Sequence, residues 1–194
     1  SNLYYAMELI EGCSLEEELM GGRKFQWREV CHIAIDLCRA LKLAHDNGIV
    51  HRDIKPANLQ WSKDGQINLS DFGIARLFGN TGLTSEGGVL GTAEYMAPEQ
   101  AFGREVDGTS DMFGLGCVLF EMAALAPMFK GKDQAEIRRL LEDDHAARMA
   151  ATLDTPYAPL IPVLVRGLQR DPAARFKDAE GFGRSLSALL PDPI

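Results

Sequence analysis

The sequence predicts a mainly α-helical fold with one small β-hairpin, and three observations carry that prediction. Residues 27–47 place apolar side chains at helical spacing, and residues 110–125 are apolar on nearly every side of a helix. Asp64-Gly65, a favoured two-residue turn, separates the alternating segments 59–62 and 66–70. With 194 residues, of which 46% are hydrophobic, the chain can bury a sizeable core.

The start of the chain indicates a strand followed by a short helix. Residues 3–10 form an apolar run that ends at Glu11-Gly12, as expected for a buried strand that leads into a connector. Ser14 and Glu17 have capping-box spacing, which predicts a helix start. Whether Ser14 is only a cap or also contacts a ligand stays open.

Two longer helices follow from hydrophobic spacing. The helix over 27–47 is expected to end at Gly48 in a left-handed conformation, and His45 near its end is interpreted as a packing residue. The helix over 110–125 must be buried because it is apolar almost all round, with Asp111 near its N-terminus. Three further helices are expected at about 133–149, 159–169 and 178–190.

The hairpin brings two polar residues to one end of its ladder. If Lys63 pairs with Gln66 across the turn, counting back along both strands places Asn58 directly opposite Asp71. An amide oxygen and a carboxylate would then meet where the ladder opens, and both are ligands that hard cations prefer.

Composition limits the partners of this chain. Twenty Lys and Arg against 28 Asp and Glu give a net charge of −8, which argues against nucleic acid or an anionic membrane as partner. No apolar run reaches the length of a membrane span. The four cysteines lack paired or metal-ligand spacing, so we expect reduced thiols in a cytoplasmic environment.

The segment 51–58 concentrates the chemistry of the chain. Within it, Asp53 can accept a hydroxyl proton, Lys55 can pair with a phosphate oxygen, and Asn58 can ligate a cation. This set suits phosphoryl transfer, where a protein orients a nucleophile and neutralises phosphate charge. Asp71 supplies the metal-binding carboxylate that the segment itself lacks.

Three ordered motifs resemble the large lobe of a protein kinase. His51-Arg52-Asp53 with Lys55 and Asn58 resembles the catalytic loop, Asp71-Phe72-Gly73 the metal-binding motif, and Ala97-Pro98-Glu99 the end of the activation segment. Lys55 and Thr92 match the pattern of serine/threonine kinases. The sequence of residues 91–100 is similar to that of bacterial serine/threonine kinases. The resemblance divides the chain into a last small-lobe strand with the hinge (1–12) and a large lobe (13–194), with the catalytic loop at 51–58 and the activation segment at 71–99.

The resemblance implies an enzyme that moves the γ-phosphoryl of ATP to a Ser or Thr of a protein substrate, with Mg²⁺ or Mn²⁺. The implied residues are Asp53, Lys55 and Asn58 for catalysis; Met7, Glu8, Ile10, Lys55, Asn58, Gln60 and Asp71 around the nucleotide; Asn58 and Asp71 for the metal; Thr92 for substrate contact; and His51, Glu99, Asp111 and Arg175 as structural support. A missing small lobe is expected to pack on the hinge side. In many relatives of the family a membrane anchor follows the kinase domain, and this chain contains no such segment.

Regulation by phosphorylation is also expected. The polar segment 74–96 is long for a connection and contains Thr84 and Ser85, and Arg52 is a cation that a phosphorylated residue there could pair with. The alternative is that Arg52 pairs only with carboxylates and that the loop is constitutively ordered.

The sequence departs from the family pattern in two places. It has no glycine-rich loop, strand lysine or partner glutamate, so the chain alone is expected to bind ATP weakly and to be inactive. Gln60 stands where the family has an apolar floor under adenine, although its aliphatic stem could still pack there. The alternative function is an inactive kinase-lobe scaffold that binds proteins.

Overall fold

The computed structural model describes residues 10–63, 65–72, 93–143 and 145–190. Their elements are, in order, β1 (Gly12–Ser14), α1 (Leu15–Met20), α2 (Trp27–Asp46), the 3-10 turn η1 (Pro56–Asn58), β2 (Leu59–Ser62), β3 (Ile67–Leu69), α5 (Pro98–Ala101), α6 (Gly108–Ala124), α7 (Gln134–Glu142), α8 (His145–Ala150), the 3-10 helix η2 (Thr155–Leu160), α9 (Ile161–Gly167), the 3-10 turn η3 (Pro172–Ala174) and α10 (Ala179–Ser187). The mainly helical character is as predicted, and the strand expected at 3–10 lies outside the described residues except for Ile10.

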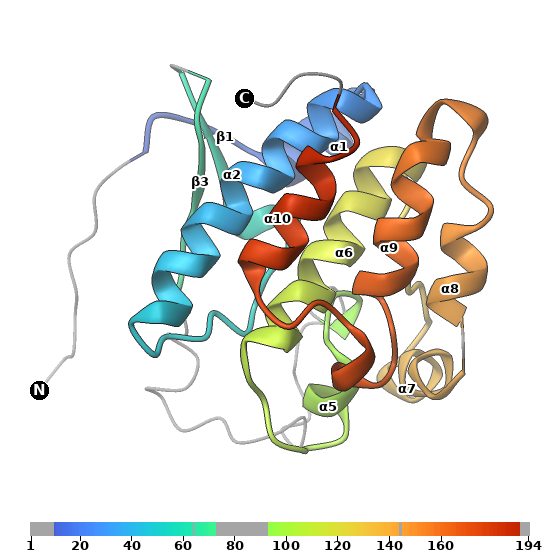
Figure 1. Ribbon diagram of the computed structural model, residues 1–194. Helices are drawn as coiled ribbons and strands as arrows, with labels where there is room; N and C mark the ends of the chain where they lie inside the picture. The colour runs from blue at the N-terminus through green and yellow to red at the C-terminus, as the bar shows by residue number, and fades with distance from the viewer. Residues whose placement is uncertain (1–9, 64, 73–92, 144, 191–194) are drawn as a thin grey trace, which may run out of the picture.

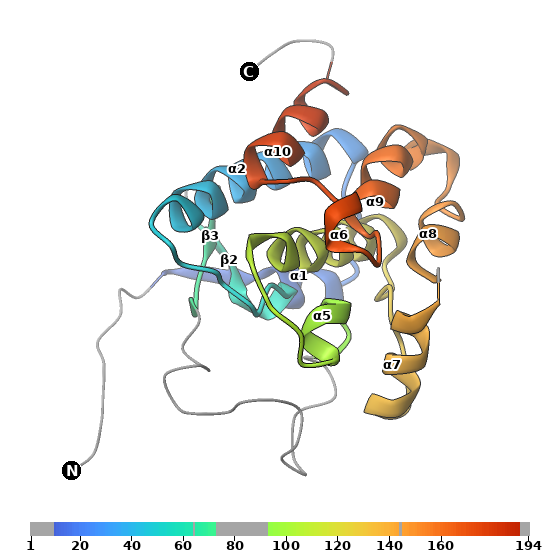
Figure 2. The same ribbon diagram turned by 60° about the horizontal axis from the view of Figure 1, so that its bottom comes forward.

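Helix α6 is the buried axis of the molecule, as its composition predicts. It packs against α2 on one side and α9 on another, with α10 lying along α2 (Figures 1 and 2). Every residue from Ser110 to Phe120 is buried. A Cβ on Gly114 would lie 3.0 Å from Ile54 Cβ, and one on Gly116 would lie 3.0 Å from Leu168 Cγ. These two glycines therefore let neighbouring chain segments approach α6 closely.

The predicted helix boundaries near the N-terminus are confirmed. Ser14 Oγ accepts a hydrogen bond from Glu17 N (3.1 Å) and Glu17 Oε2 accepts one from Ser14 N (2.7 Å), which completes the capping box of α1. Helix α2 spans the predicted range to within one residue, and Gly48 follows it with φ +73°. The capping box and the glycine could be recognised from sequence because each lies within four residues of the helix end that it marks.

The sheet has three antiparallel strands instead of a hairpin alone, because β1 pairs with β2. The predicted register is wrong by one residue. Leu59 lies opposite Leu69, and Ser62 N donates to Gln66 O (2.9 Å), so three residues lie between this last bonded pair. Gly65 has φ +84° and donates its N–H to Ser62 O, which closes this longer loop.

Two of the three later helices also differ from prediction. The helix expected over 133–149 is two helices, α7 and α8, because Asp143 has an extended backbone (ψ 166°) and its carboxylate pairs with Arg148. The segment expected as a helix over 159–169 begins as the 3-10 helix η2, and α9 follows from Ile161 to Gly167. Pro159 and Pro162 lack the N–H that an α-helix interior requires, which explains the late start.

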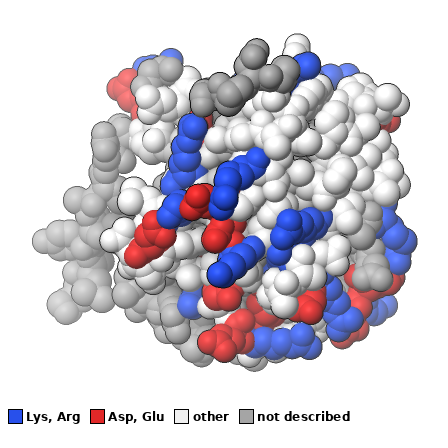
Figure 3. Space-filling model, in the orientation of Figure 1, with Lys and Arg blue, Asp and Glu red and all other residues white. Residues whose placement is uncertain are grey.

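The surface formed by α2 and α10 carries both signs of charge side by side (Figure 3). Its ion pairs join Arg39 to Asp36, Lys42 to Asp46 and Glu180, and Arg184 to Glu180. Among the described residues, no helix is both long and apolar enough to pass through a membrane.

All four cysteines are unpaired, and three are buried. Burial raises the pKa of Cys31 to about 11 and that of Cys38 to about 12. These two thiols therefore stay protonated at neutral pH and are poor nucleophiles.

Candidate active site

Asp111, in the first turn of α6, holds the backbone of the segment 51–58. Its carboxylate is 1% exposed and accepts hydrogen bonds from the N–H of His51 (2.9 Å) and of Arg52 (2.7 Å). Arg52 has φ +70°, a left-handed conformation that strains a non-glycine residue by about 1–3 kcal/mol. The bond from Asp111 helps to hold that strained backbone in place.

His45 reaches the same carboxylate from α2. Its Nε2 lies 2.7 Å from Asp111 Oδ2, and its side chain is 16% exposed. The interpretation of His45 as a packing residue is therefore wrong in one respect, because the ring is also a polar partner of Asp111. A Cβ on Gly108 would lie 2.8 Å from His45 Nδ1, so the helix α6 begins close to this ring.

His51 connects the segment 51–58 to the end of β3. The ring is fully buried; its Nδ1 accepts a hydrogen bond from Asp53 N (3.2 Å) and its Nε2 lies 2.8 Å from Ser70 O. Because Nδ1 is an acceptor, Nε2 carries the proton and donates to Ser70 O, which is the neutral form of the ring. The ring also packs edge-on against Phe72, with centroids 4.8 Å apart.

Three of the predicted catalytic residues meet at one carboxylate. Asp53 Oδ2 lies 2.8 Å from Lys55 Nζ and accepts a hydrogen bond from Asn58 Nδ2 (3.0 Å). Asn58 Nδ2 also donates to Asp53 O (2.8 Å). The side chains of Asp53 and Lys55 are 29% and 21% exposed, so a reactant can still reach them. A cation and an amide thus hold the carboxylate in one orientation.

Asp71 lies one residue beyond the position predicted for it, because Ser70 and not Asp71 is opposite Asn58. Ser70 N and Oγ both donate to Asn58 O, at 2.9 and 3.1 Å, and Ser70 Oγ lies 3.5 Å from Asp71 Oδ2. Asp71 is exposed and has φ +59°, which turns the chain as the ladder ends. Ser70 therefore links the two residues that the hairpin was expected to join directly.

Asn58 and Asp71 could supply two oxygen ligands to a metal ion whose other ligands come from water and a bound substrate. Because Asn58 uses its amide nitrogen on Asp53, its oxygen faces away from that carboxylate. Among the described residues, no group of three His, Cys, Asp or Glu side chains could hold a metal ion by itself. One amide oxygen and one carboxylate suit Mg²⁺, which keeps water and substrate phosphates as its other ligands.

Part of the predicted nucleotide and substrate site lies outside the described residues: Met7, Glu8, Thr84, Ser85 and Thr92. Ile10 is described and half-buried. Gln60 lies in the central strand β2, and its Nε2 donates to Ala57 O (3.0 Å). The amide of Gln60 is thus turned back toward the segment 51–58.

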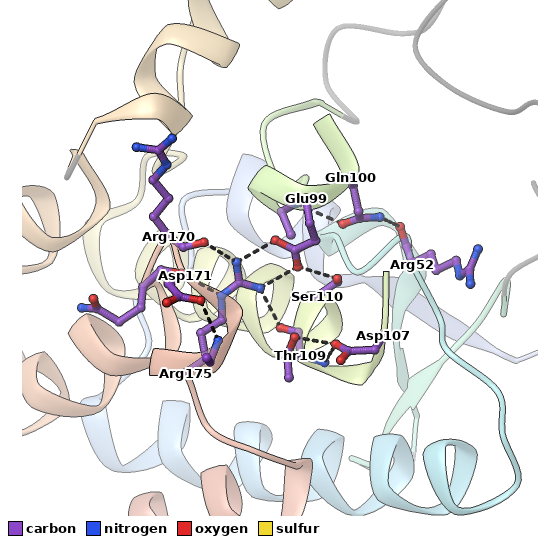
Figure 4. Close-up of polar contacts among 12 residues, drawn as sticks. Arg52, Glu99, Gln100, Asp107, Thr109, Ser110, Arg170, Asp171 and Arg175 are labelled. Carbon is purple, nitrogen blue, oxygen red and sulfur yellow. Dashed lines mark hydrogen bonds and ion pairs between the residues drawn. The ribbon is translucent and has the colours of Figure 1, made fainter. Parts of the chain in front are cut away.

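A buried ion pair between Glu99 and Arg175 joins α5 to η3 (Figure 4). Two parallel bonds of 2.7 Å link the guanidinium to the carboxylate, and Ser110 Oγ donates to Glu99 Oε1 (2.5 Å). Burial alone would raise the pKa of Glu99, but the hydrogen bonds from Arg175 and Ser110 outweigh it and lower the pKa below its usual value. The carboxylate is therefore charged at neutral pH.

The sequence prediction missed Gln100, Tyr95 and Glu121. Gln100 Oε1 accepts from Ala97 N (3.0 Å), and its Nε2 donates to Arg52 O (2.8 Å). A signal for the first bond exists in the sequence, since a Gln two residues after a Pro at a helix start has capping spacing. Tyr95 donates to Glu121 (2.6 Å), and burial raises the pKa of both groups. No local pattern indicates that second pair.

The chain is similar to protein kinases along most of its length. The family model described as "Protein kinase domain" matches residues 1–180. The relatives include a probable serine/threonine-protein kinase of Streptomyces coelicolor, SCO3848, which is 36% identical over 191 residues. The serine/threonine-protein kinase PknB is 36% identical over 180 residues in Mycolicibacterium smegmatis and 34% identical over 178 residues in Mycobacterium tuberculosis.

These matches cover most of this chain but a minor part of each relative. They include 96% of the chain for the Streptomyces coelicolor protein and 91% for the two PknB proteins. The chain spans 28% of the length of each of these three relatives.

Proposed function

Because the chain belongs to the protein kinase family, we propose that residues 13–194 form the large lobe of a bacterial-type serine/threonine kinase and that residues 1–12 contain the last small-lobe strand and the hinge. The intact protein would transfer the γ-phosphoryl of ATP to a Ser or Thr hydroxyl of a protein. The observation that supports this most is the meeting of Lys55 and Asn58 at the Asp53 carboxylate, on a backbone anchored to α6.

Asp53 is the proposed proton acceptor. A base must lie within hydrogen-bond reach of the hydroxyl, and its orientation must be fixed before the substrate arrives. Asn58 holds one oxygen of Asp53 from within the same segment, and the carboxylate is partly exposed. Asp53 would orient the Ser or Thr hydroxyl and accept its proton as the phosphoryl group is transferred.

Lys55, Asn58 and Asp71 are proposed to neutralise and hold the phosphate end of the nucleotide. Magnesium, when bound there, would supply positive charge that offsets the charge of the transferring phosphoryl group. Asn58 Oδ1 and the Asp71 carboxylate would be the protein ligands of that ion, and Lys55 would contact the transferring phosphate. Gln60, Ile10, Glu8 and Met7 would surround the adenine.

Regulation by phosphorylation of Thr84 or Ser85 forms part of the proposal. Figure 4 shows the Arg52 side chain extending away from Glu99 and Gln100, so it is directed outside the buried network. A phosphate on the segment 74–96 could pair with this guanidinium through charge-assisted hydrogen bonds. Replacing both Thr84 and Ser85 by Ala would then abolish activation by phosphorylation.

The test is transfer of radiolabelled phosphate from MgATP to a generic protein substrate. This chain would be compared with the same chain carrying its upstream coding sequence, and each with its Asp53→Asn and Asp71→Asn variants. We expect activity only in the extended protein and loss of that activity in both variants. Full turnover by either variant would contradict the assigned roles. Inactivity of the extended protein, together with no stabilisation by nucleotide, would favour the protein-binding scaffold.

A further inference from the structure

Gln100 joins two segments that lie 48 positions apart in the sequence. Its Oε1 accepts the N–H of Ala97 at the start of α5 (3.0 Å), and its Nε2 donates to the carbonyl of Arg52 (2.8 Å). One amide therefore uses its acceptor within its own helix and its donor on the segment that carries Asp53. Figure 4 shows Gln100 between α5 and Arg52.

The carbonyl that Gln100 contacts belongs to the peptide group immediately before Asp53. The N–H of that same peptide group is the N–H of Asp53, which donates to His51 Nδ1 (3.2 Å). Both polar atoms of this peptide group thus have side-chain partners. Because a peptide group is planar, fixing both atoms fixes the direction in which the chain enters Asp53.

The residue before Asp53 needs such support because its backbone is strained. Arg52 has φ +70°, which a non-glycine residue keeps only where its surroundings impose it. Asp111 on α6 binds the N–H of Arg52, and Gln100 binds its carbonyl. The neighbour of Gln100, Glu99, is itself bonded to Ser110 on α6 and to Arg175. Both sides of Arg52 are therefore anchored to the buried axis of the molecule.

A small pocket lies beside Gln100 and the segment that carries Asp53. Its volume is about 10 Å³, and it is lined by Arg52, Asp53, Tyr95, Gln100 and Asp111, among others. The hydrogen bond from Gln100 Nε2 reaches the Arg52 carbonyl from α5 across this junction.

We propose that Gln100 is a positioning residue for Asp53, which sets the direction of the proposed base by holding the Arg52 carbonyl. The role of Asp53 rests on the proposed function, whereas the hold of Gln100 on the segment 51–58 does not. Gln100 makes no proposed contact with nucleotide or protein substrate. Its loss should therefore slow the chemical step without weakening the binding of ATP.

Two variants separate the bond to Arg52 from the bond to Ala97. Gln100→Glu has the same length and keeps an oxygen that can accept from Ala97 N, but it cannot donate to Arg52 O. Gln100→Met loses both bonds. The control is Gln169→Met, which removes a comparable side-chain bond, from Gln169 Nε2 to Val165 O (2.8 Å), and none of the bonds at Arg52.

The first readout is steady-state kinetics of the extended protein with MgATP and a protein substrate. We expect kcat to fall about five- to tenfold in Gln100→Glu and in Gln100→Met, with the KM for ATP changed less than twofold and Gln169→Met like wild type. Unchanged kcat in both Gln100 variants would overturn the proposal. A loss confined to Gln100→Met would also overturn it, since the Ala97 bond would then be the important one.

The second readout is amide hydrogen exchange of this chain, which needs no activity. We expect faster exchange in peptides covering 52–54 for Gln100→Glu and unchanged exchange in α10, with no change at 52–54 for Gln169→Met. If the extended protein transfers no phosphate, the proposed function fails and exchange alone decides the role of Gln100. Unchanged exchange at 52–54 in Gln100→Glu would then refute the hold on this segment.

Discussion

Removing the guanidinium of Arg175 should destabilise the fold more than almost any other single change. Its side chain is fully buried, and all five of its N–H donors are used. The acceptors are Glu99 Oε1 and Oε2 at 2.7 Å, Gln169 O at 2.7 Å, and the carbonyls of Thr109 and Arg170 at 3.1 Å. Arg175→Met keeps an apolar stem of similar length and removes every one of these bonds.

The expected loss follows from what remains behind. The Glu99 carboxylate, which is 3% exposed, would keep Ser110 alone as a side-chain partner among the described residues, and three carbonyls would lose a donor. Breaking one side of a buried ion pair costs about 3–5 kcal/mol. Since domains of this kind unfold with about 5–15 kcal/mol, the variant should lose about a fifth of the total or more. Arg184→Met is the control, because Arg184 is 73% exposed and should change stability by less than about 0.5 kcal/mol.

Urea unfolding followed by circular dichroism measures these changes, and a double-mutant cycle isolates the charge. In a Glu99→Leu background no carboxylate is left unpaired, so Arg175→Met should cost about 2 kcal/mol less than it does in the wild type. A loss below about 1 kcal/mol for Arg175→Met would refute the reasoning. An equal loss in both backgrounds would show that the carbonyls and not the charge dominate.

Three further outcomes are expected. Ser14→Ala removes the capping-box hydroxyl and should lower the free energy of unfolding by about 1 kcal/mol in the same urea assay, whereas no change would mean that Glu17 alone caps α1. In Asp111→Asn one oxygen remains where two now contact His51, Arg52 and His45, so amide exchange at 51–52 should become faster. Unchanged exchange at 51–52 would contradict the anchoring role of Asp111. The pKa of Glu99 is lowered in the folded state, so its contribution is complete above the usual value of 4.5 and is lost as the pH falls through the folded pKa. Glu99→Gln should show a shallower loss of stability in acid, and an unchanged pH profile of unfolding would refute that contribution.

Features that depend on local sequence could be predicted well. The capping box at Ser14, the helix α2 and its left-handed cap at Gly48 each depend on residues within a few positions of one another. The buried nature of α6 also followed from its composition alone, because a helix that is apolar all round has to be covered by protein.

The hairpin register could not be predicted from its turn residues. Asp64-Gly65 is compatible with a two-residue loop and with a three-residue loop that ends in a left-handed glycine. The structure has the longer loop, which moves Ser70 opposite Asn58. A shift of one residue reverses the face of every side chain on the second strand, so this small difference changes which group contacts Asn58.

The single helix predicted over 133–149 failed for a related reason. Residues on both sides of Asp143 continue a helical pattern, and nothing in that pattern records the extended backbone at Asp143. At the break the Asp143 carboxylate pairs with Arg148, a contact that the helical spacing on either side does not indicate.

The conformation of the segment 51–58 is imposed from a distance and not by its own sequence. Left-handed φ at Arg52 is unfavourable for an arginine, and the bond from Asp53 N to His51 Nδ1 is a local one that spans it. The compensating bonds come from Asp111, 59 residues away, and Gln100, 48 residues away. The conformation of the candidate site therefore depends on the packing of α5 and α6 against it. Changes that loosen these contacts should therefore disorder the segment around Asp53 before they unfold α6, which is why exchange at 51–54 is a more sensitive measurement than overall stability.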